Sequence, residues 1–218
     1  MDEDSLQKHC DTLAGITLAE LALLAGLPLP LNMTQGKGFL GMALERVLGT
    51  TAGNASLPDF HHLGIELKTL PIGTNHKPLE STYVTMVPLK IDQACQWRAS
   101  ICYHKLQKVL FVPFEGDRDI PFAVRRLGAG FLWSPSAEEE AVLENDWREI
   151  MDYIIAGRID EIDARMGLYL QVRPKAAHGK VLTWTWNEQG EKVQTLPRGF
   201  YLRSCFTQKI FLQQEHRA

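Results

Sequence analysis

Two carboxylates and a lysine lie within one short stretch of the sequence, at Asp59, Glu66 and Lys68. The residues around Glu66 and Lys68 alternate between apolar and polar, which is typical of a β-strand. Because successive side chains of a strand point to opposite faces, Glu66 and Lys68 share one face, and Ile65 and Leu67 share the other. A carboxylate and an ammonium on such a strand are costly to bury unless they bind something.

A hard divalent cation is the natural partner of Asp59 and Glu66, since Mg²⁺ binds through few carboxylates, water and substrate phosphate oxygens. Lys68 would then lie beside the metal, near an attacking water and a phosphate. The pattern Asp-x(n)-[Asp/Glu]-x-Lys is loose. Of the eleven lysines, however, only Lys68 has an acid two positions upstream. The pattern fits a metal-dependent nuclease and, equally, a surface strand that carries an ordinary Glu–Lys face.

A further acid, Glu45, lies on a helix predicted over residues 38–48. At about 100° per residue, Glu45 falls roughly 60° past the edge of the apolar stripe of that helix. This border position would let Glu45 lean over the metal site. A plain solvated glutamate is the alternative.

Length and composition limit the class of protein. A chain of 218 residues suits one sizeable domain or two small lobes sharing a core. It is 45% hydrophobic and 22% charged, as in ordinary globular proteins. The acidic N-terminus has no apolar core, which argues against a secretory signal and favours a cytoplasmic location. Four scattered cysteines indicate free thiols and argue against a zinc site.

Charge is distributed unevenly along the chain. The formal net charge of -3 alone counts against DNA binding. Residues 138–163 hold ten acids and two bases, whereas residues 165–209 hold eight bases and two acids. The basic C-terminal third could meet phosphate while an acidic helix faces away. Two solvated faces without a partner are the alternative.

The expected elements alternate between helices and strands, with a mostly consecutive run of strands in the middle. This order predicts a mixed α/β (α+β) core. A capping box at Thr17 and Glu20 opens the first helix, which stops at Gly26. Helices are expected over residues 18–26, 38–48, 137–156 and 204–214, and strands over 64–70, 82–87, 108–114, 130–133 and 169–172.

Several motifs extend this pattern and together resemble the MutH mismatch-repair endonucleases. The matching segments run in order over nearly the whole chain, from residue 18 to about residue 206. They are Gly36-Lys37-Gly38, Pro58-Asp59-Phe60, Leu63-Gly64-Ile65-Glu66-Leu67-Lys68-Thr69, Leu79-Glu80-Ser81-Thr82, His104-Lys105-Leu106, Leu132-Trp133-Ser134-Pro135, Arg173-Pro174-Lys175 and Leu196-Pro197-Arg198-Gly199-Phe200-Tyr201-Leu202.

The resemblance implies a restriction-endonuclease-like core, in which helices flank a mixed central sheet. It implies one nuclease domain over residues 1–218, either as one body or as two lobes forming a DNA cleft. The family nicks the unmethylated strand at hemimethylated GATC sites, 5′ to the G. It requires Mg²⁺ and is activated by the repair protein MutL.

The resemblance also assigns residues. Asp59, Glu66 and Lys68 match the catalytic set, and Glu45 matches a further acid near the metal, so the expected metal ligands are Asp59, Glu66 and Glu45. Lys105 matches a residue of the active-site region.

For DNA, Lys37 matches a lysine near the duplex, and Arg173 and Tyr201 match residues that read or sense the GATC site. Tyr83 stands where the family carries an aromatic residue, often phenylalanine. The planar fork of an arginine suits guanine O6 and N7. Arg198, Lys175 and Lys180 are expected to contact phosphates. Packing of Tyr201 in the core is the alternative to a sensing role.

Two other functions compete with the nicking enzyme. A restriction endonuclease that cuts both strands of GATC needs two active sites. The single acid–acid–lysine motif and the absence of a duplication therefore favour a monomeric nickase. A DNA-binding repair scaffold without chemistry would have a broken set of catalytic residues, and here that set is intact.

Overall fold

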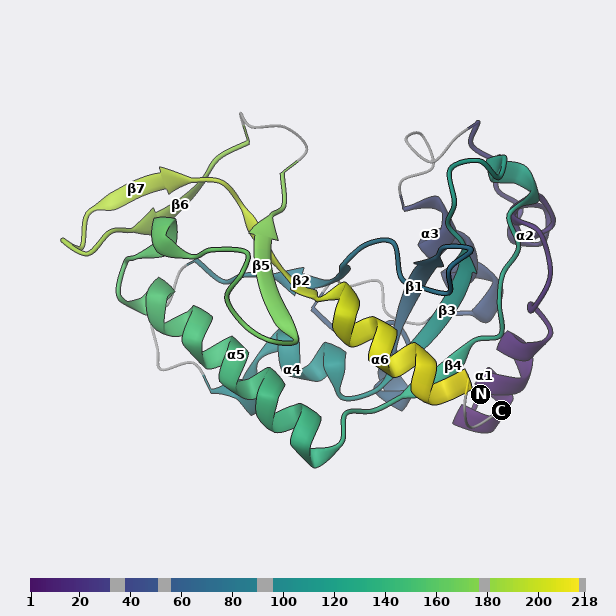
Figure 1. The fold of residues 1–218 in the computed structure, drawn as a ribbon, viewed down its shortest axis with the longest axis horizontal. Coiled ribbons are helices and arrows are strands. Elements are labelled where there is room, and N and C mark those ends of the chain that lie inside the picture. Colours follow the sequence, from purple (N-terminus) through teal and green to yellow (C-terminus); the bar gives the residue numbers. More distant parts are fainter. Residues whose placement is uncertain (32–37, 51–55, 90–95, 177–180, 216–218) are drawn as a thin grey trace. The chain divides into compact units, whose positions relative to one another are not determined.

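The computed structural model describes residues 1–31, 38–50, 56–89, 96–176 and 181–215 (Figure 1). The chain divides into two compact units. Unit 1 comprises Met1–Glu80, Gln107–Ser134 and Gln208–Ala218, and unit 2 comprises Ser81–Leu106 and Pro135–Thr207. Each unit is therefore assembled from separate stretches of the chain. That residues 1–218 act as one nuclease domain stays a prediction.

Unit 1 is built on a three-stranded mixed sheet. Its strands are β1 (Glu66–Ile72), β3 (Val109–Glu115) and β4 (Phe131–Trp133), in the order β1-β3-β4. β1 and β3 are parallel, and β3 and β4 are antiparallel. Every residue of β3 except Glu115 is buried, which explains its continuous apolar run. The predicted mixed α/β fold is confirmed.

The first strand runs beyond the predicted range of residues 64–70, through Pro71, which lies just past its expected end. β1 continues through Pro71 to Ile72, and the two pair with Phe114 and Glu115 of β3. β1 is an edge strand in the sheet order. An edge strand tolerates a proline because the missing N–H can face the side without a partner strand.

Three helices cover the sheet of unit 1: α1 (Glu3–Asp11), α2 (Leu18–Ala25) and α3 (Phe39–Leu48). The capping box at Thr17 and Glu20 is present, and α2 ends at Gly26 as predicted. α2 packs on α3, and α3 packs on β1. Their apolar faces share one hydrophobic core with β1 and β3. This packing holds the first strand, and so the acid–acid–lysine motif, against the helical layer.

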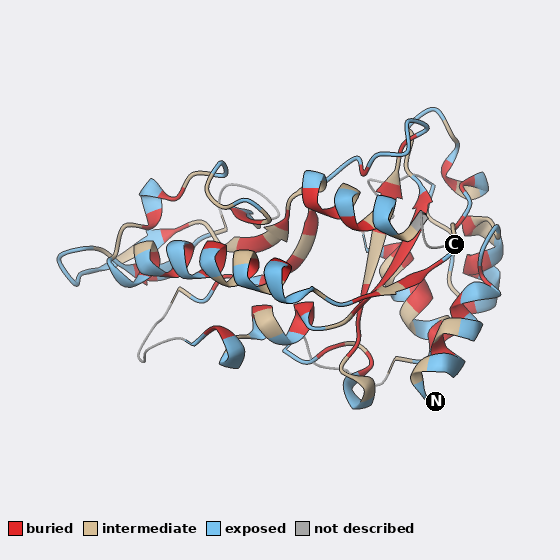
Figure 2. Cartoon of the chain, turned by 60° about the horizontal axis from the view of Figure 1, so that its bottom comes forward, coloured by how far each residue is buried: buried red, intermediate tan, exposed pale blue. Residues whose placement is uncertain are grey.

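Unit 2 contains an antiparallel sheet of β2 (Thr82–Met86), β8 (Arg198–Leu202) and β5 (Leu170–Pro174), in the order β2-β8-β5. The helix α4 (Ile101–Leu106) packs on β2, and α5 (Ala137–Ile155) packs on β5. Buried and exposed residues alternate around α5 in Figure 2, as an amphipathic helix requires. A hairpin of β6 (Thr183–Trp186) and β7 (Lys192–Thr195) forms a separate two-stranded sheet.

The helix α6 (Ser204–Glu215) begins in unit 2 and ends in unit 1. Short 3-10 helices complete the fold: η1 (His61–Leu63), η2 (Trp97–Ala99), η3 (Phe122–Val124) and η4 (Ile159–Glu161). Within the described ranges, no helix is both long and apolar enough to cross a membrane.

One buried carboxylate fixes the entrance to β5. Asp146 of α5 is almost fully buried. Its carboxylate accepts hydrogen bonds from the backbone N–H groups of Leu168, Tyr169 and Leu170 at 2.9, 2.7 and 2.9 Å. A buried charge is tolerated only when it is bonded in this way. Asp146 therefore ties the helix to the strand that carries Arg173.

The guanidinium of Arg203 binds the backbone carbonyl groups of the same segment. Arg203 donates to the carbonyl oxygens of Ala164, Met166 and Gly167 at 2.7, 2.9 and 2.9 Å. Gly167 has a φ of 77°, and a Cβ added there would lie 2.0 Å from the Leu170 carbonyl oxygen. Only glycine fits this tight approach. Asp146 and Arg203 together fix both the donors and the acceptors of the loop before β5.

We expect Asp146→Ala to lower the free energy of unfolding by about 3–5 kcal/mol, because three N–H groups lose their acceptor. Urea denaturation measures the loss. Glu144→Ala is the matched control on the same helix. It removes only the ion pair with Arg148 one turn away, which should cost about 0.5 kcal/mol. Similar losses in the two variants would contradict the anchoring role of Asp146.

Candidate active site

A short turn places Asp59, the first carboxylate of the motif, beside β1. Phe60 and Ile65 form an antiparallel bridge around η1, with Phe60 N–H donating to the Ile65 carbonyl at 2.9 Å. The turn brings Asp59 alongside the strand, where its Oδ2 accepts from the Leu67 N–H at 2.8 Å. Asp59 and Glu66 therefore lie at the same end of β1, although seven positions separate them.

The second carboxylate and the lysine form an ion pair, in which Glu66 is buried and Lys68 is half-buried. Lys68 Nζ lies 2.6 Å from Glu66 Oε1. The side chains of Glu66 and Lys68 are 2% and 15% exposed. The flanking Ile65 and Leu67 are buried as well. The predicted sharing of one face by Glu66 and Lys68 is confirmed, and the burial is deeper than an ordinary surface strand allows.

The donor set fits a magnesium ion. Mg²⁺ binds proteins through one or two carboxylates and completes its shell with water and phosphate oxygens. Asp59 and Glu66 supply two carboxylates at one strand end. In the described parts of the chain, no group of three or more His, Cys, Asp and Glu side chains forms a metal cluster. Glu45 is half-buried on α3, the helix that packs on β1, and its role as a third ligand stays a prediction.

Three lysines, Lys37, Lys105 and Lys180, were also expected near the active site or the DNA. Lys105 is buried on α4 of unit 2, whereas Asp59, Glu66 and Lys68 belong to unit 1. Its part in the active site therefore stays a prediction. Lys37 lies outside the described residues, as does Lys180.

Four predicted DNA-contact residues gather on the sheet of unit 2. Tyr83 of β2 is paired with Tyr201 of β8, and the ring centroids are 5.4 Å apart at an interplanar angle of 65°. Lys175 Nζ lies 4.2 Å from the Tyr83 ring centroid, a cation–π contact. The exposed Arg173 is paired with Gly199 of β8. By the alternation of strand side chains, Arg173 and Tyr201 face the same side.

Gly199 allows this aromatic pair to form. A Cβ at position 199 would lie 2.9 Å from Tyr83 Cε2 and 3.1 Å from Tyr201 Cε2. Both distances are shorter than carbon–carbon contact, so any side chain here would push the rings apart. The two rings can therefore approach closely because Gly199 has no side chain.

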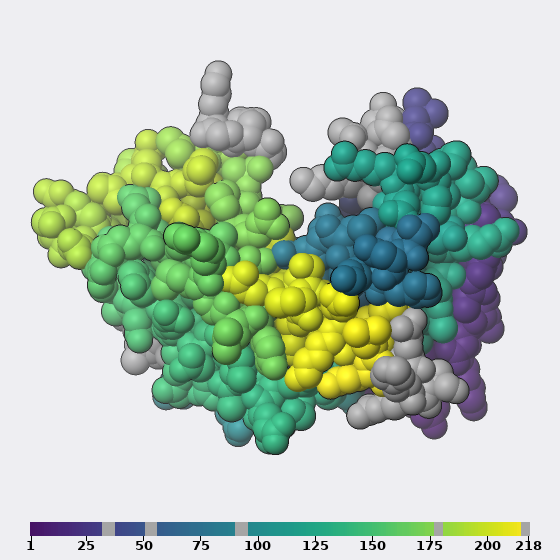
Figure 3. Space-filling view, viewed as in Figure 1, coloured from purple at the N-terminus to yellow at the C-terminus, as the bar shows by residue number. Residues whose placement is uncertain are grey.

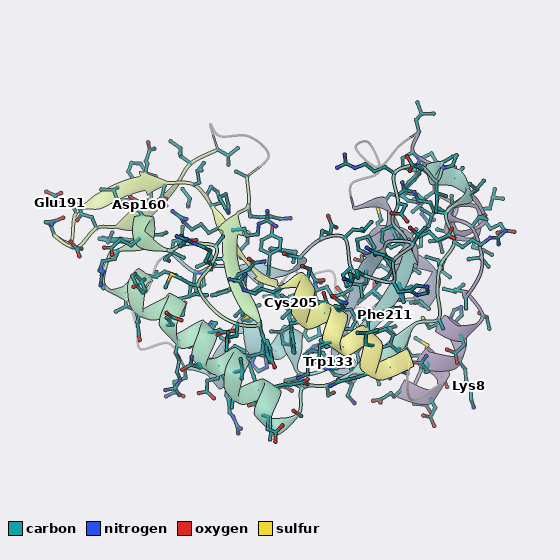
Figure 4. The ribbon with its side chains drawn as sticks, viewed as in Figure 1. Lys8, Trp133, Asp160, Glu191, Cys205 and Phe211 are labelled. Carbon is teal, nitrogen blue, oxygen red and sulfur yellow. The ribbon has the colours of Figure 1, made fainter. Side chains whose placement is uncertain are left out.

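Arg198 does not join this group. It lies one position before Gly199 on β8 and so faces the opposite side of the sheet from Tyr201. Its side chain is 14% exposed, and its Nη2 lies 3.4 Å from Asp160 Oδ1. Asp160 is on η4 and is labelled in Figure 4. Within the described structure the buried Nε has no hydrogen-bond partner. The phosphate contact expected of Arg198 stays a prediction, and its geometry is that of a partly buried structural arginine.

Asp146 and Arg203, which position β5, were not predicted from the sequence. A signal for Asp146 exists. Leu143, Trp147 and Ile150 form the buried stripe of α5, and Asp146 falls at helical spacing on that same stripe. An acid among buried positions indicates a structural carboxylate. Counting it among the solvated acids of residues 138–163 concealed its role.

Three cysteines are free thiols, as predicted: Cys10, Cys102 and Cys205. Burial raises the pKa of the Cys10 thiol to about 11 and raises the pKa of the Cys102 thiol further. Both thiols stay protonated at neutral pH, which makes them poor metal ligands. Cys95 lies outside the described residues.

A mixed sheet with an acid–acid–lysine set at the start of its edge strand is typical of restriction-endonuclease-like nucleases. Comparison with known proteins agrees. Residues 48–146 match the family described as DNA mismatch repair enzyme MutH. The DNA mismatch repair protein MutH of Actinobacillus pleuropneumoniae serotype 5b is 50% identical over 210 residues, covering 95% of this chain and 92% of that protein.

Two further relatives carry the same name. The Vibrio campbellii protein is 47% identical over 211 residues, covering 97% of this chain and 93% of its own length. The Escherichia coli O1:K1 protein is 48% identical over 208 residues, covering 95% and 91%. This chain belongs to the MutH family of DNA mismatch repair endonucleases. It is an enzyme that binds DNA and hydrolyses phosphodiester bonds.

We expect Gly199→Ala to destabilise unit 2 by about 1–3 kcal/mol, because the new methyl group overpacks the two rings. Thermal or urea unfolding measures the loss. In a Tyr83→Ala background the same substitution should cost much less, since one of the two obstructing rings is gone. A cost that is equal in both backgrounds would mean that Gly199 is required for another reason.

Proposed function

We propose that this endonuclease uses Mg²⁺ to nick the unmethylated strand of hemimethylated GATC sites, 5′ to the G, in methyl-directed mismatch repair. The observation that carries the proposal is the ion pair of the buried Glu66 with Lys68, with Asp59 fixed beside it on the Leu67 amide. Membership of the MutH family supports the same activity. The proposal includes a cytoplasmic enzyme that acts as a monomer and is activated by a MutL-type repair protein.

Each residue of the set has a distinct part in the hydrolysis. Asp59 and Glu66 hold the metal, and the Leu67 N–H fixes the orientation of Asp59. A bound Mg²⁺ would activate a water molecule and neutralise charge on the phosphate. Lys68, which lies against Glu66, donates to the phosphate oxygens as charge develops or orients the attacking water. Glu45 is the further acid beside the metal.

Recognition of the sequence is assigned to unit 2. The exposed Arg173 presents a planar fork that matches guanine O6 and N7. Lys175 contacts a phosphate while its ammonium lies over the Tyr83 ring. Tyr201, packed edge-on against Tyr83, senses the N6 position of adenine. The rigid pairing of the two rings is what would make a single added methyl group costly.

Supercoiled plasmid containing GATC sites separates this function from its competitors. With Mg²⁺ and the MutL-type activator, a nicking enzyme converts it to open circles. Linear product would instead indicate a restriction-like enzyme that cuts both strands. Unchanged plasmid would indicate a non-catalytic DNA-binding scaffold. The latter two results would each overturn the proposal.

We expect Glu66→Gln and Asp59→Asn to abolish nicking with little change in DNA affinity, because both lose charge on a metal ligand. Lys68→Ala should lower the single-turnover rate by about 100-fold or more, since it acts on the transition state. Lys175→Ala is the matched control. It should weaken binding to every sequence and reduce the salt slope by roughly one unit. A Lys68→Ala enzyme that loses affinity but keeps its rate would reverse these assignments.

We expect Tyr201→Ser to nick unmethylated GATC more slowly and to discriminate less against methylated adenine. The N6-methyl group no longer meets a packed ring, which removes a penalty of about 1–3 kcal/mol. The measurement is the ratio of nicking rates on unmethylated and fully methylated duplexes. A ratio equal to that of the wild type would remove Tyr201 from the sensor and transfer the role to Tyr83 or Arg173.

A further inference from the structure

The β6–β7 hairpin exposes two tryptophans on one face. Trp184 and Trp186 are 44% and 40% exposed. They lie two positions apart on β6 and so point to the same side. Their cross-strand partners on β7 are Gln194 and Lys192. These four residues make up what we call the outer face of the hairpin. The hairpin belongs to unit 2 and is yellow-green in Figure 3.

The distribution of side chains on this hairpin is the reverse of an ordinary amphipathic strand. The opposite face carries three threonines and Val193, and Thr185 and Thr195 are buried. Thr185 Oγ1 donates to the Leu89 carbonyl at 3.3 Å. Small polar residues are thus turned inward while two of the largest apolar side chains face water. Exposed tryptophans gathered in a patch mark a binding surface far more often than an inert one.

A cation completes the outer face. Lys192 Nζ lies 4.7 Å from the centroid of the Trp184 ring. The nearby acids of the hairpin lie in its turn and are engaged there. Glu191, labelled in Figure 4 at the hairpin tip, accepts from Asn187 at 2.9 Å, and Glu188 lies 3.7 Å from Arg158. The strands themselves contribute a positive charge and no acid to the outer face.

The hairpin is also connected in sequence to the two strands that are proposed to recognise DNA. It lies in sequence between β5, which carries Arg173, and β8, which carries Tyr201. Where the hairpin leaves these strands, the Lys175 N–H donates to the Pro197 carbonyl at 2.7 Å. The aromatic and basic outer face is therefore joined directly to the recognition strands.

We propose that the outer face of the hairpin binds an unpaired DNA strand, with bases stacked on Trp184 and Trp186 and phosphate held by Lys192. Every base has a flat π-face, so exposed aromatic rings beside a cation form a stacking platform without sequence preference. Side chains two positions apart on a strand are about 7 Å apart, which suits a stretched single strand. Bases within a duplex are already stacked on each other and cannot use such a platform.

The proposal rests on DNA being the substrate of this enzyme, but its test does not involve nicking. An oligothymidylate is unpaired and contains no GATC. Its binding is followed by anisotropy of a fluorescent label and by quenching of tryptophan emission. The other three tryptophans, Trp97, Trp133 and Trp147, are buried. A contact on the outer face should therefore quench only the emission of Trp184 and Trp186.

We expect the oligothymidylate to quench the wild-type protein. The double variant Trp184→Leu/Trp186→Leu should raise its Kd by at least about tenfold. The matched variant Trp184→Phe/Trp186→Phe keeps two stacking rings and should stay within about threefold of the wild type. Lys192→Gln should lower the salt slope of binding by roughly 0.7.

Three results would overturn the proposal. One is equal affinity of the leucine variant and the wild type, which would mean that aromatic stacking does not contribute. Another is quenching by duplex but not by oligothymidylate, which would assign the outer face to paired DNA. The third is no quenching by either, which would leave the tryptophans for a protein partner. Because none of these assays measures cleavage, a failure to nick GATC plasmid would not affect their outcome.

Discussion

The pairing of Glu66 with Lys68 inside the first strand constrains the whole of unit 1. A carboxylate that is 2% exposed must be compensated, and here the ammonium of Lys68 compensates it. The helices fix the position of the pair from the opposite face of the strand: Ile65 and Leu67 join the core of α2 and α3, and α3 packs on β1. The helical layer therefore does more than complete a core. It holds in place the strand on which the buried charge of Glu66 interacts strongly with Lys68.

Charge on unit 2 is arranged differently, through many small compensations. Five of the ten acids in residues 138–163 form an ion pair with an arginine, so these acids do not act together as one repelling face. The pairs are Glu140 with Arg98, Glu144 with Arg148, Asp160 with Arg198, Glu161 with Arg158 and Asp163 with Arg165. The bases involved are largely neutralised within unit 2, which leaves Arg173 and Lys175 as the prominent cations beside the tyrosine pair. Local counts of charge thus overstate both the acidic and the basic surface.

The acid–acid–lysine set and most of the elements could be recognised in the sequence because their signals are local. The capping box of α2, the apolar run of β3 and the spacing of Glu66 and Lys68 depend on neighbouring residues alone. The helices α1 and α4, the strand β8 and the hairpin were missed. The six residues of α4 hold little periodicity, and TWTW in β6 reverses the usual face pattern. The pairing of Tyr83 with Tyr201 was also beyond reach. It depends on which strands become neighbours, and local patterns do not encode that.

The division of the chain into interleaved segments has a consequence for biosynthesis. β1 and β3 pair in unit 1, yet β2 and α4 of unit 2 lie between them in sequence. β2 finds its partner only when β8 has been made, as the pairing of Thr82 with Leu202 shows. Such a high contact order slows folding. During translation the unpaired edge of β2 stays exposed on the ribosome, where it is a target for chaperones and for aggregation. Neither unit can fold to completion until nearly the last residue of the recognition strands has been added.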